Sequence, residues 1–151
     1  MILLEKISNF ELRNLVEIAY SGDTELLDKY WGDGFSFYEA VEENLRCINL
    51  VGKEVEEAGK RMDYYSVILD DEEIGYVCCF QNNLYSFSIN INYRTKTNLS
   101  ELWERIKEIM GGSFICALFP QITRAINWLK KCGMVEVDGI ENNCTILLNV
   151  K

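Results

Sequence analysis

The chain has 151 residues, the size of one ordinary domain, and its 48% of hydrophobic and 26% of charged residues are typical of a globular protein. We therefore predict a single domain spanning residues 1–151. Its 15 basic and 24 acidic residues give a net charge of −9, which repels a phosphate backbone and disfavours a nucleic-acid partner. The apolar runs are too short to span a bilayer, and Glu5 comes too early for a secretory signal, so we expect a cytoplasmic protein with no membrane partner.

The sequence contains no histidine, which excludes Ser-His and Cys-His nucleophile pairs and removes the commonest metal ligand. Its six cysteines show no CxxC spacing and lie mostly in apolar segments, which favours buried, reduced thiols over disulfides or a zinc site. We therefore predict no metal site. The cysteines are Cys47, Cys78, Cys79, Cys116, Cys132 and Cys144.

The N-terminal third is predicted to be mostly helical. Ser8 with Glu11, and later Ser36 with Glu39, have the spacing of a capping box at the start of a helix. Residues 50–62 contain two glycines and a charged face, so the pattern leaves open whether they form a weak helix or a loop. The predicted elements are a strand at 2–7 and helices at 8–20, 24–30 and 36–48.

Beyond this third the pattern changes to three short strands joined by the polar turns "DDEE" and "QNN", which predicts an antiparallel meander. The third strand, residues 84–92, alternates in character and places Tyr85, Phe87, Ile89 and Ile91 on one face.

The rest of the chain alternates helices with strands. A helix is predicted from Leu99 to Met110, with Asn98 as its N-cap, and a second helix is predicted to begin at Pro120 and to end before Gly133. Apolar segments predict strands at 114–119, 134–138 and 143–150. Without the short helix near residue 24, the order is β-α-α-β-β-β-α-β-α-β-β, a mixed α/β fold.

The segment "NINYRTKTNLSEL", residues 90–102, joins a strand to a capped helix. The first turn of a helix presents free N–H groups and the positive end of the helix dipole, and Arg94 and Lys96 add two charges here. The segment is therefore a candidate site for the pyrophosphate of a nucleotide-bearing cofactor. A solvated basic turn explains the same residues, and the absence of glycine from the segment leaves both readings open.

The strand order, the segment "IGYV" in the meander, "INYRTK" before a helix and "RAINWLKKCGM" near the C-terminus resemble the GNAT superfamily of acyl-CoA-dependent N-acetyltransferases. The resemblance implies a central, mostly antiparallel mixed sheet with helices on both faces. It also implies that the fourth and fifth strands run parallel and splay around acetyl-CoA, the co-substrate.

The resemblance further implies which residues bind the cofactor. The family's phosphate-binding pattern falls on Arg94, Thr97 and Leu99, of which the last two replace small residues. The backbone of the fourth strand would contact pantetheine and the thioester carbonyl. The implied cofactor-binding residues are Ile89, Ile91, Arg94, Thr95, Lys96, Thr97, Asn98 and Leu99.

The last helix departs from the family in its proton donor. Counted from Ala125, the positions that many members fill with Asn and with a general-acid Tyr hold Ile122 and Leu129, neither of which can donate a proton. Its replacement must be a Tyr, a Cys, water or nothing. The candidates are Tyr93 and Cys116, with Tyr38 and Tyr85 also to be inspected.

Three glutamates of the early helix are candidate bases, because the family often builds its acceptor wall there: Glu39, Glu42 and Glu43. Solvated charges on a helix face and a core thiol at Cys116 are the plain structural alternatives. Trp31, Trp103, Trp128 and the segment 35–38 either line an acceptor groove or fill the core.

We expect an acetyl-CoA-dependent N-acetyltransferase acting on a small amine or a lysine-bearing acceptor, to which the acidic surface is complementary. The motif departures leave a second reading open, a catalytically inactive GNAT-like binding or structural module related to phage or mobile elements. A third reading is a small acidic regulator or protein-interaction domain without a cofactor, which predicts no occupied cleft beside residues 94–98. The sequence does not indicate an oligomeric state.

Overall fold

The structure, a computed structural model, describes residues 1–26, 36–137 and 144–150. Trp31, Phe35 and the second half of the predicted helix 24–30 lie outside the described residues. The strands are β1 Ile2–Ile7, β2 Asp63–Leu69, β3 Glu72–Phe80, β4 Asn83–Ile89, β5 Phe114–Leu118, β6 Val135–Val137 and β7 Thr145–Asn149. The α-helices are α1 Leu12–Tyr20, α2 Thr24–Leu26, α3 Phe37–Glu57, α4 Lys96–Met110 and α5 Thr123–Lys131, with 3-10 turns η1 Asn9–Glu11 and η3 Ile91–Tyr93.

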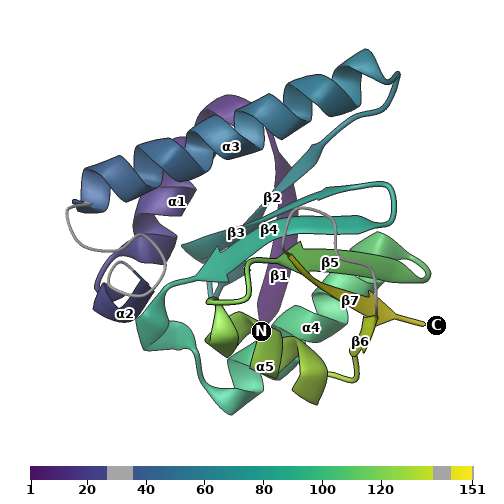
Figure 1. The fold of residues 1–151 in the computed structure, drawn as a ribbon. Helices are drawn as coiled ribbons and strands as arrows, with labels where there is room; N and C mark the ends of the chain where they lie inside the picture. Colours follow the sequence, from purple (N-terminus) through teal and green to yellow (C-terminus); the bar gives the residue numbers. More distant parts are fainter. Residues whose placement is uncertain (27–35, 138–143, 151) are drawn as a thin grey trace.

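The strands form one sheet in the order β1-β2-β3-β4-β5-β7-β6 (Figure 1). β4 and β5 pair in parallel, and the other strand pairs of the described chain are antiparallel. The meander turns as predicted, because Asp70 and Asp71 both adopt positive φ, 48° and 68°, between the paired residues Leu69 and Glu72. The mixed, mostly antiparallel α/β architecture is therefore confirmed.

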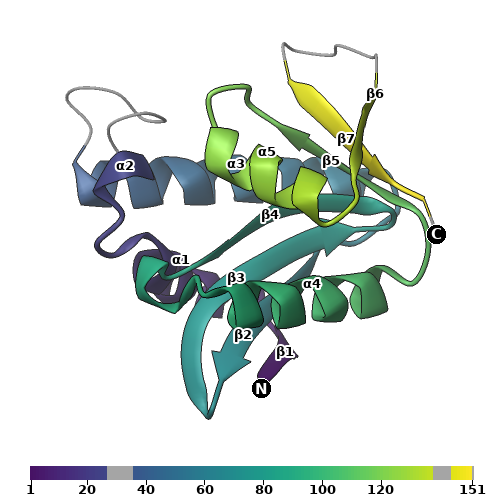
Figure 2. The same cartoon turned by 90° about the horizontal axis from the view of Figure 1, so that it is seen from below.

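Helices cover both faces of the sheet. α1 and α3 pack on one face, around Leu15, Ile48 and Tyr76, and α4 and α5 pack on the other, around Ile106 and Leu129. Figure 1 shows the first pair above the sheet, and Figure 2, seen from below, shows α4 and α5 in front of it. The amphipathic patterns of these helices thus make two separate cores.

Two of the three tryptophans fill the core. The ring of Trp103 lies 5.7 Å from that of Phe114 and 6.1 Å from that of Trp128, centroid to centroid. Trp103 is buried, and Trp128 packs against the same cluster. Trp103 and Trp128 therefore fill the core and do not line an acceptor groove.

The long helix α3 extends to Glu57, beyond the predicted end at Ile48, and includes residues 50–57 of the segment 50–62 that the pattern left open. Glycine inside a helix costs about 1 kcal/mol relative to alanine. At Gly52 the missing side chain makes room, because a Cβ there would lie 3.0 Å from the hydroxyl oxygen of Tyr64. Tertiary packing therefore explains a glycine that had weakened the helix prediction.

The start of α4 corrects the prediction. The helix begins at Lys96, not at Leu99, and its N-cap is Thr95, whose Oγ1 accepts the N–H of Asn98 at 3.2 Å. Asn98 is not the cap, because its side-chain amide donates to the carbonyl of Tyr93 at 2.9 Å. α5 likewise begins at Thr123, three residues after Pro120.

Among the described residues, no helix is long and apolar enough to cross a membrane, and no group of three or more Cys, Asp or Glu side chains is arranged to hold a metal ion.

Candidate functional site

β4 and β5 are joined only at the ends where they begin. The one register pair of these two fully described strands is Asn83 with Ile115, and the N–H of Ile115 donates to the carbonyl of Asn82 at 2.8 Å. Adjacent parallel strands normally continue such bonds along their length. The C-terminal ends, at Ile89 and Leu118, therefore separate, and we call this feature the β4–β5 divergence.

The end of β4 is fixed by Asn90, a residue that sequence reasoning passed over. Its side-chain amide donates to the carbonyls of Ile18 and Ser21, at 2.8 and 3.2 Å, and its Oδ1 accepts the N–H of Asn92. Asn90 is 9% exposed. These bonds hold the end of α1 against the start of the turn that leads into α4.

Close approach of β3 and β4 supports the same region. A Cβ on Gly75 would lie 2.1 Å from the carbonyl oxygen of Ser88 and 2.7 Å from the Cα of Ile89. Real Cβ atoms do not approach backbone atoms this closely, so the position requires glycine. The "IGYV" segment therefore contributes a glycine that places the end of β4.

The N-terminus of α4 lies directly after this turn. The first intrahelical bond runs from the N–H of Leu99 to the carbonyl of Thr95, and Thr95 caps the N–H of Asn98. The N–H groups of Lys96 and Thr97 have no acceptor among the described residues, and both side chains are exposed. The first turn contains no acidic residue. An anion placed here meets two N–H donors, the helix dipole and the Lys96 ammonium.

In a loop wrapped around a phosphate, Leu99 and Arg94 would face the anion. In this structure both side chains contact other parts of the protein instead. The Leu99 side chain packs against the core cluster with α4. The Arg94 side chain is 23% exposed, and its Nε donates to the carbonyl of Ile89 at 3.0 Å. Its NH2 donates to the Oδ2 of Asp23 at 2.9 Å.

Asp23, Arg94 and Arg124 form a cluster, named here the Asp23 cluster, that sequence reasoning missed. The Nη2 of Arg124 donates to both carboxylate oxygens of Asp23 at 2.8 Å, and the N–H of Leu26 donates to Oδ1 of Asp23 at 3.2 Å. The Asp23 side chain is completely buried. Burial would raise the pKa of Asp23, but the hydrogen bond from Arg124 and the charge of Arg94 outweigh it and hold the pKa below its usual 3.8.

The candidate bases on α3 are engaged in local contacts. Glu39 forms the predicted capping box: its N–H donates to the Oγ of Ser36 at 3.2 Å and its carboxylate accepts from the Ser36 N–H. Glu42 pairs with Arg13, and this partner lowers the pKa of Glu42. The pKa of Glu43 is also lowered, chiefly by its hydrogen bond from Arg46.

The candidate proton donors lie in three different environments. Cys116 is 1% exposed in the core under α4 and α5, and burial raises its pKa to about 12, which suits a core thiol. Tyr93, beside the end of β4, donates its hydroxyl to Glu72 at 3.0 Å, and this contact raises its pKa. Tyr38 is 70% exposed, and burial raises the pKa of Tyr85 to about 12.

The structure thus brings one set of predicted residues together and separates the others. Ile89, Ile91 and residues 94–99 surround the end of β4 and the start of α4. Glu39 stands on α3, which covers one face of the sheet, whereas Cys116 belongs to the core on the other face.

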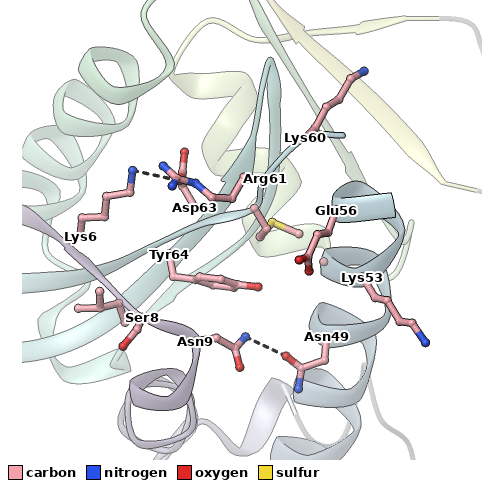
Figure 3. A pocket seen from close by; sticks show the side chains of 13 residues that line it. Lys6, Ser8, Asn9, Asn49, Lys53, Glu56, Lys60, Arg61, Asp63 and Tyr64 are labelled. Atoms are coloured by element: carbon pink, nitrogen blue, oxygen red, sulfur yellow. Dashed lines mark hydrogen bonds and ion pairs between the residues drawn. The ribbon is translucent and has the colours of Figure 1, made fainter. Parts of the chain in front are cut away.

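A pocket of about 600 Å³ lies away from the β4–β5 divergence, between the start of β2 and the second half of α3 (Figure 3). Figure 3 shows the Tyr64 ring between the Lys6–Asp63–Arg61 group and the hydrogen-bonded pair Asn9 and Asn49. The strand register puts this pocket level with the beginning of β4, at the opposite end of the sheet from Ile89.

Comparison with known proteins identifies the fold. No protein-family model matches the chain, and no curated protein matches it in sequence. Solved structures do match. PaiA N-acetyltransferase from Thermoplasma acidophilum in complex with coenzyme A is 16% identical with a TM-score of 0.67, over 100% of this chain and 99% of that one.

Two other solved structures agree. Aminoglycoside acetyltransferase AAC(6')-Ib in complex with coenzyme A and kanamycin is 13% identical with a TM-score of 0.68, over 100% of this chain and 95% of that one. The GNAT domain of S. lividans PAT is 11% identical with a TM-score of 0.61, over 98% and 88%. The chain therefore has the fold of these GNAT acetyltransferases with a divergent sequence, and the expected fold is confirmed.

Proposed function

We propose that this protein binds an acyl-CoA at the β4–β5 divergence and transfers its acetyl group to an amine. The observation that carries the proposal is the pair of unpaired N–H groups, of Lys96 and Thr97, at the N-terminus of α4, directly beside the end of β4. The similar structures of PaiA N-acetyltransferase and AAC(6')-Ib are complexes with coenzyme A, which supports acetyl-CoA as the co-substrate here. The single register pair of β4 and β5, at Asn83 and Ile115, favours the two cofactor-binding readings over the third, a regulator without a cofactor.

The residues fit a diphosphate without the family's glycines. The amides of Lys96 and Thr97 and the ammonium of Lys96 would hold it, and Leu99 leaves the approach open because its side chain packs into the core. The backbone at Ile89 and Ile91 would align the pantetheine arm. Acetyl-CoA, when bound, supplies the activated acyl group.

The chain's own contribution to the transfer is to orient the acceptor and move two protons. Leu129, at the family's tyrosine position, is fully buried and holds no proton donor. Tyr93 is the proposed donor, because the residue lies on the turn that ends β4, with its hydroxyl bonded to Glu72 at the start of β3, and Glu39 is the proposed base at the start of α3. The net charge of −9 favours a cationic small amine or a lysine-bearing acceptor, and we propose that the protein acts in the cytoplasm.

A second candidate function is a GNAT-like module that binds a cofactor without turnover. The buried, apolar Leu129 favours it, because the usual acid is replaced by a core residue. The two functions share the cofactor site and differ only in the chemistry. A Tyr93→Phe variant separates them, since it should lower acetyl transfer while leaving acetyl-CoA affinity unchanged if Tyr93 is the donor.

The binding proposal is tested by calorimetric titration of acetyl-CoA into the wild type, Lys96→Pro and Lys96→Ala. Proline fits the first helical position, and Thr95, at φ −82° and ψ 160°, has the extended backbone that a residue before proline prefers. Lys96→Ala removes only the ammonium, whereas Lys96→Pro also removes the N–H.

A charge-assisted hydrogen bond contributes about 1.5–3 kcal/mol, so Lys96→Pro should bind about tenfold or more weakly than Lys96→Ala. Equal affinities of the two variants would show that the diphosphate does not use this amide. No heat from the wild type at near-millimolar acetyl-CoA would refute the proposal as a whole.

A further inference from the structure

The Asp23 cluster connects the two sides of the β4–β5 divergence. Arg94 follows β4, Arg124 stands in the first turn of the helix that follows β5, and Asp23 comes from the turn between α1 and α2. The two ion pairs join residues 71 and 101 positions apart in the sequence. A buried carboxylate therefore lies where the strand ends separate, and both its oxygens are held by guanidinium groups.

The two arginines do not hold Asp23 equally. Arg124 contacts both oxygens at 2.8 Å, and the N–H of Leu26 donates a further bond. Arg94 makes a single bond to Oδ2, at 2.9 Å. If Arg94 left, Asp23 would keep the opposite charge and hydrogen bonds of Arg124 and the N–H of Leu26, so its burial would stay compensated.

Arg94 also has a natural second partner. It lies two residues before Lys96, in the segment that presents free N–H groups at the start of α4. Its Nε bond to the carbonyl of Ile89 keeps the guanidinium beside the end of β4. Guanidinium forks bind phosphate oxygens as readily as carboxylates, so a diphosphate at α4 and the carboxylate of Asp23 compete for the same group.

We propose that Asp23 is a built-in competitor of the anionic ligand: it holds Arg94 in the free protein, and a diphosphate binds by taking Arg94 from Asp23 while Arg124 keeps Asp23 paired. That the diphosphate belongs to an acyl-CoA rests on the function proposed above. Asp23 thereby sets the affinity of the site without touching the ligand, and Arg124 is a positioning residue.

The test uses inorganic pyrophosphate as the probe, titrated calorimetrically at low ionic strength into the whole chain. Asp23→Asn keeps the size of the side chain and an oxygen for Leu26 but frees Arg94. Asp23→Asn should bind pyrophosphate about tenfold or more tightly than the wild type, the value of one charge-assisted contact. The double variant Asp23→Asn with Arg94→Ala should lose that gain. A folded Asp23→Asn protein that binds as the wild type does, or more weakly, overturns the proposal.

A second variant covers the case in which Asp23→Asn does not fold. Arg124→Gln leaves Asp23 to Arg94 alone, so Arg94 should be held more firmly and pyrophosphate should bind more weakly. In an Arg94→Ala background, Arg124→Gln should not change pyrophosphate affinity, because Arg124 acts on the ligand only through Arg94. An equal loss in both backgrounds would mean that Arg124 touches the ligand itself, which contradicts the assigned role.

Parallel titrations with acetyl-CoA separate this inference from the proposed function. Wild-type binding of acetyl-CoA that Asp23→Asn fails to tighten supports the function and overturns the inference. Tighter pyrophosphate binding by Asp23→Asn, with no acetyl-CoA binding by either protein, supports the competitor role and refutes the function.

Discussion

The substitution Gly75→Ala should disrupt the place where β3 supports the end of β4. The added carbon would lie 2.1 Å from the Ser88 carbonyl oxygen and 2.7 Å from the Ile89 Cα. Both are backbone atoms and cannot rotate away, so the two strands must move apart by about 1 Å or more to reach ordinary contact distances. Overpacking of this kind costs about 1–3 kcal/mol, and backbone overlap places Gly75→Ala at or above the top of that range.

The assay is thermal and urea unfolding beside Gly112→Ala, a control at which a Cβ meets nothing within 4 Å. For a chain of this size, about 3 kcal/mol corresponds to a melting temperature lowered by about 6–12 °C. The control should stay within about 0.5 kcal/mol of the wild type. A Gly75→Ala protein as stable as Gly112→Ala would refute the argument that this glycine places the end of β4.

Three further changes test other parts of the structure. Tyr76→Phe should destabilise the fold by about 1–3 kcal/mol in urea unfolding, because the buried hydroxyl of Tyr76 bonds Asn44 and Ser86 at 3.0 Å each, whereas Tyr38→Phe at the surface should cost nothing measurable. The folded-state pKa of Asp23 lies below 3.8, so the unfolded chain binds more protons in acid and the stabilisation from Asp23 is present above about pH 4 and lost as pH falls through the folded pKa. The stability difference between the wild type and Asp23→Asn should therefore shrink as pH falls from about 5 through the lowered pKa of Asp23, and a difference that does not change with pH would contradict the assignment. Cys116 should resist a thiol reagent at pH 8 until the chain unfolds, as peptide mapping would show, because burial raises its pKa to about 12; rapid labelling in the native state would contradict its core position.

Local patterns predicted most of the architecture. The polar turns between strands were enough for the meander, since a hairpin is specified by residues close in sequence. The predicted common face of Tyr85, Phe87 and Ile89 was wrong, because the register of β3 and β4 shifts between Cys78 and Cys79. Tyr85 packs with the cluster under α1 and α3, whereas Phe87 and Ile89 pack with the cluster under α4 and α5. The capping box of Ser36 and Glu39 likewise marked the start of α3. The parallel pairing of β4 with β5 came from the family resemblance, not from any local signal.

The start of α4 was wrong by three residues for a physical reason. Thr95 and Asn98 are both good N-caps, and the choice between them depends on where the Asn98 side chain goes. It bonds the carbonyl of Tyr93, in a turn that local propensity does not reveal. The correction moves Lys96 and Thr97 from a loop to the first turn of a helix, which is the feature that best supports an anion site.

The Asp23 cluster could not be found from the sequence. A carboxylate after Gly22 reads as a polar turn residue or a helix cap, and its two partners lie 71 and 101 positions away. Arg94 was identified as a candidate ligand, but its engagement with Asp23 depends on tertiary packing. Interactions over such separations have no periodicity that a single sequence can show.

The most direct test of the central claim is a titration of ¹⁵N-labelled protein with acetyl-CoA, followed by the backbone amide resonances. The N–H groups of Lys96 and Thr97 should show the largest changes, because they are the proposed donors to the diphosphate. Amides beside the Tyr64 pocket, such as Gly52 and Lys53, should stay in place. Changes confined to Gly52 and Lys53, or no change at saturating acetyl-CoA, would contradict the assignment of the cofactor site to the N-terminus of α4.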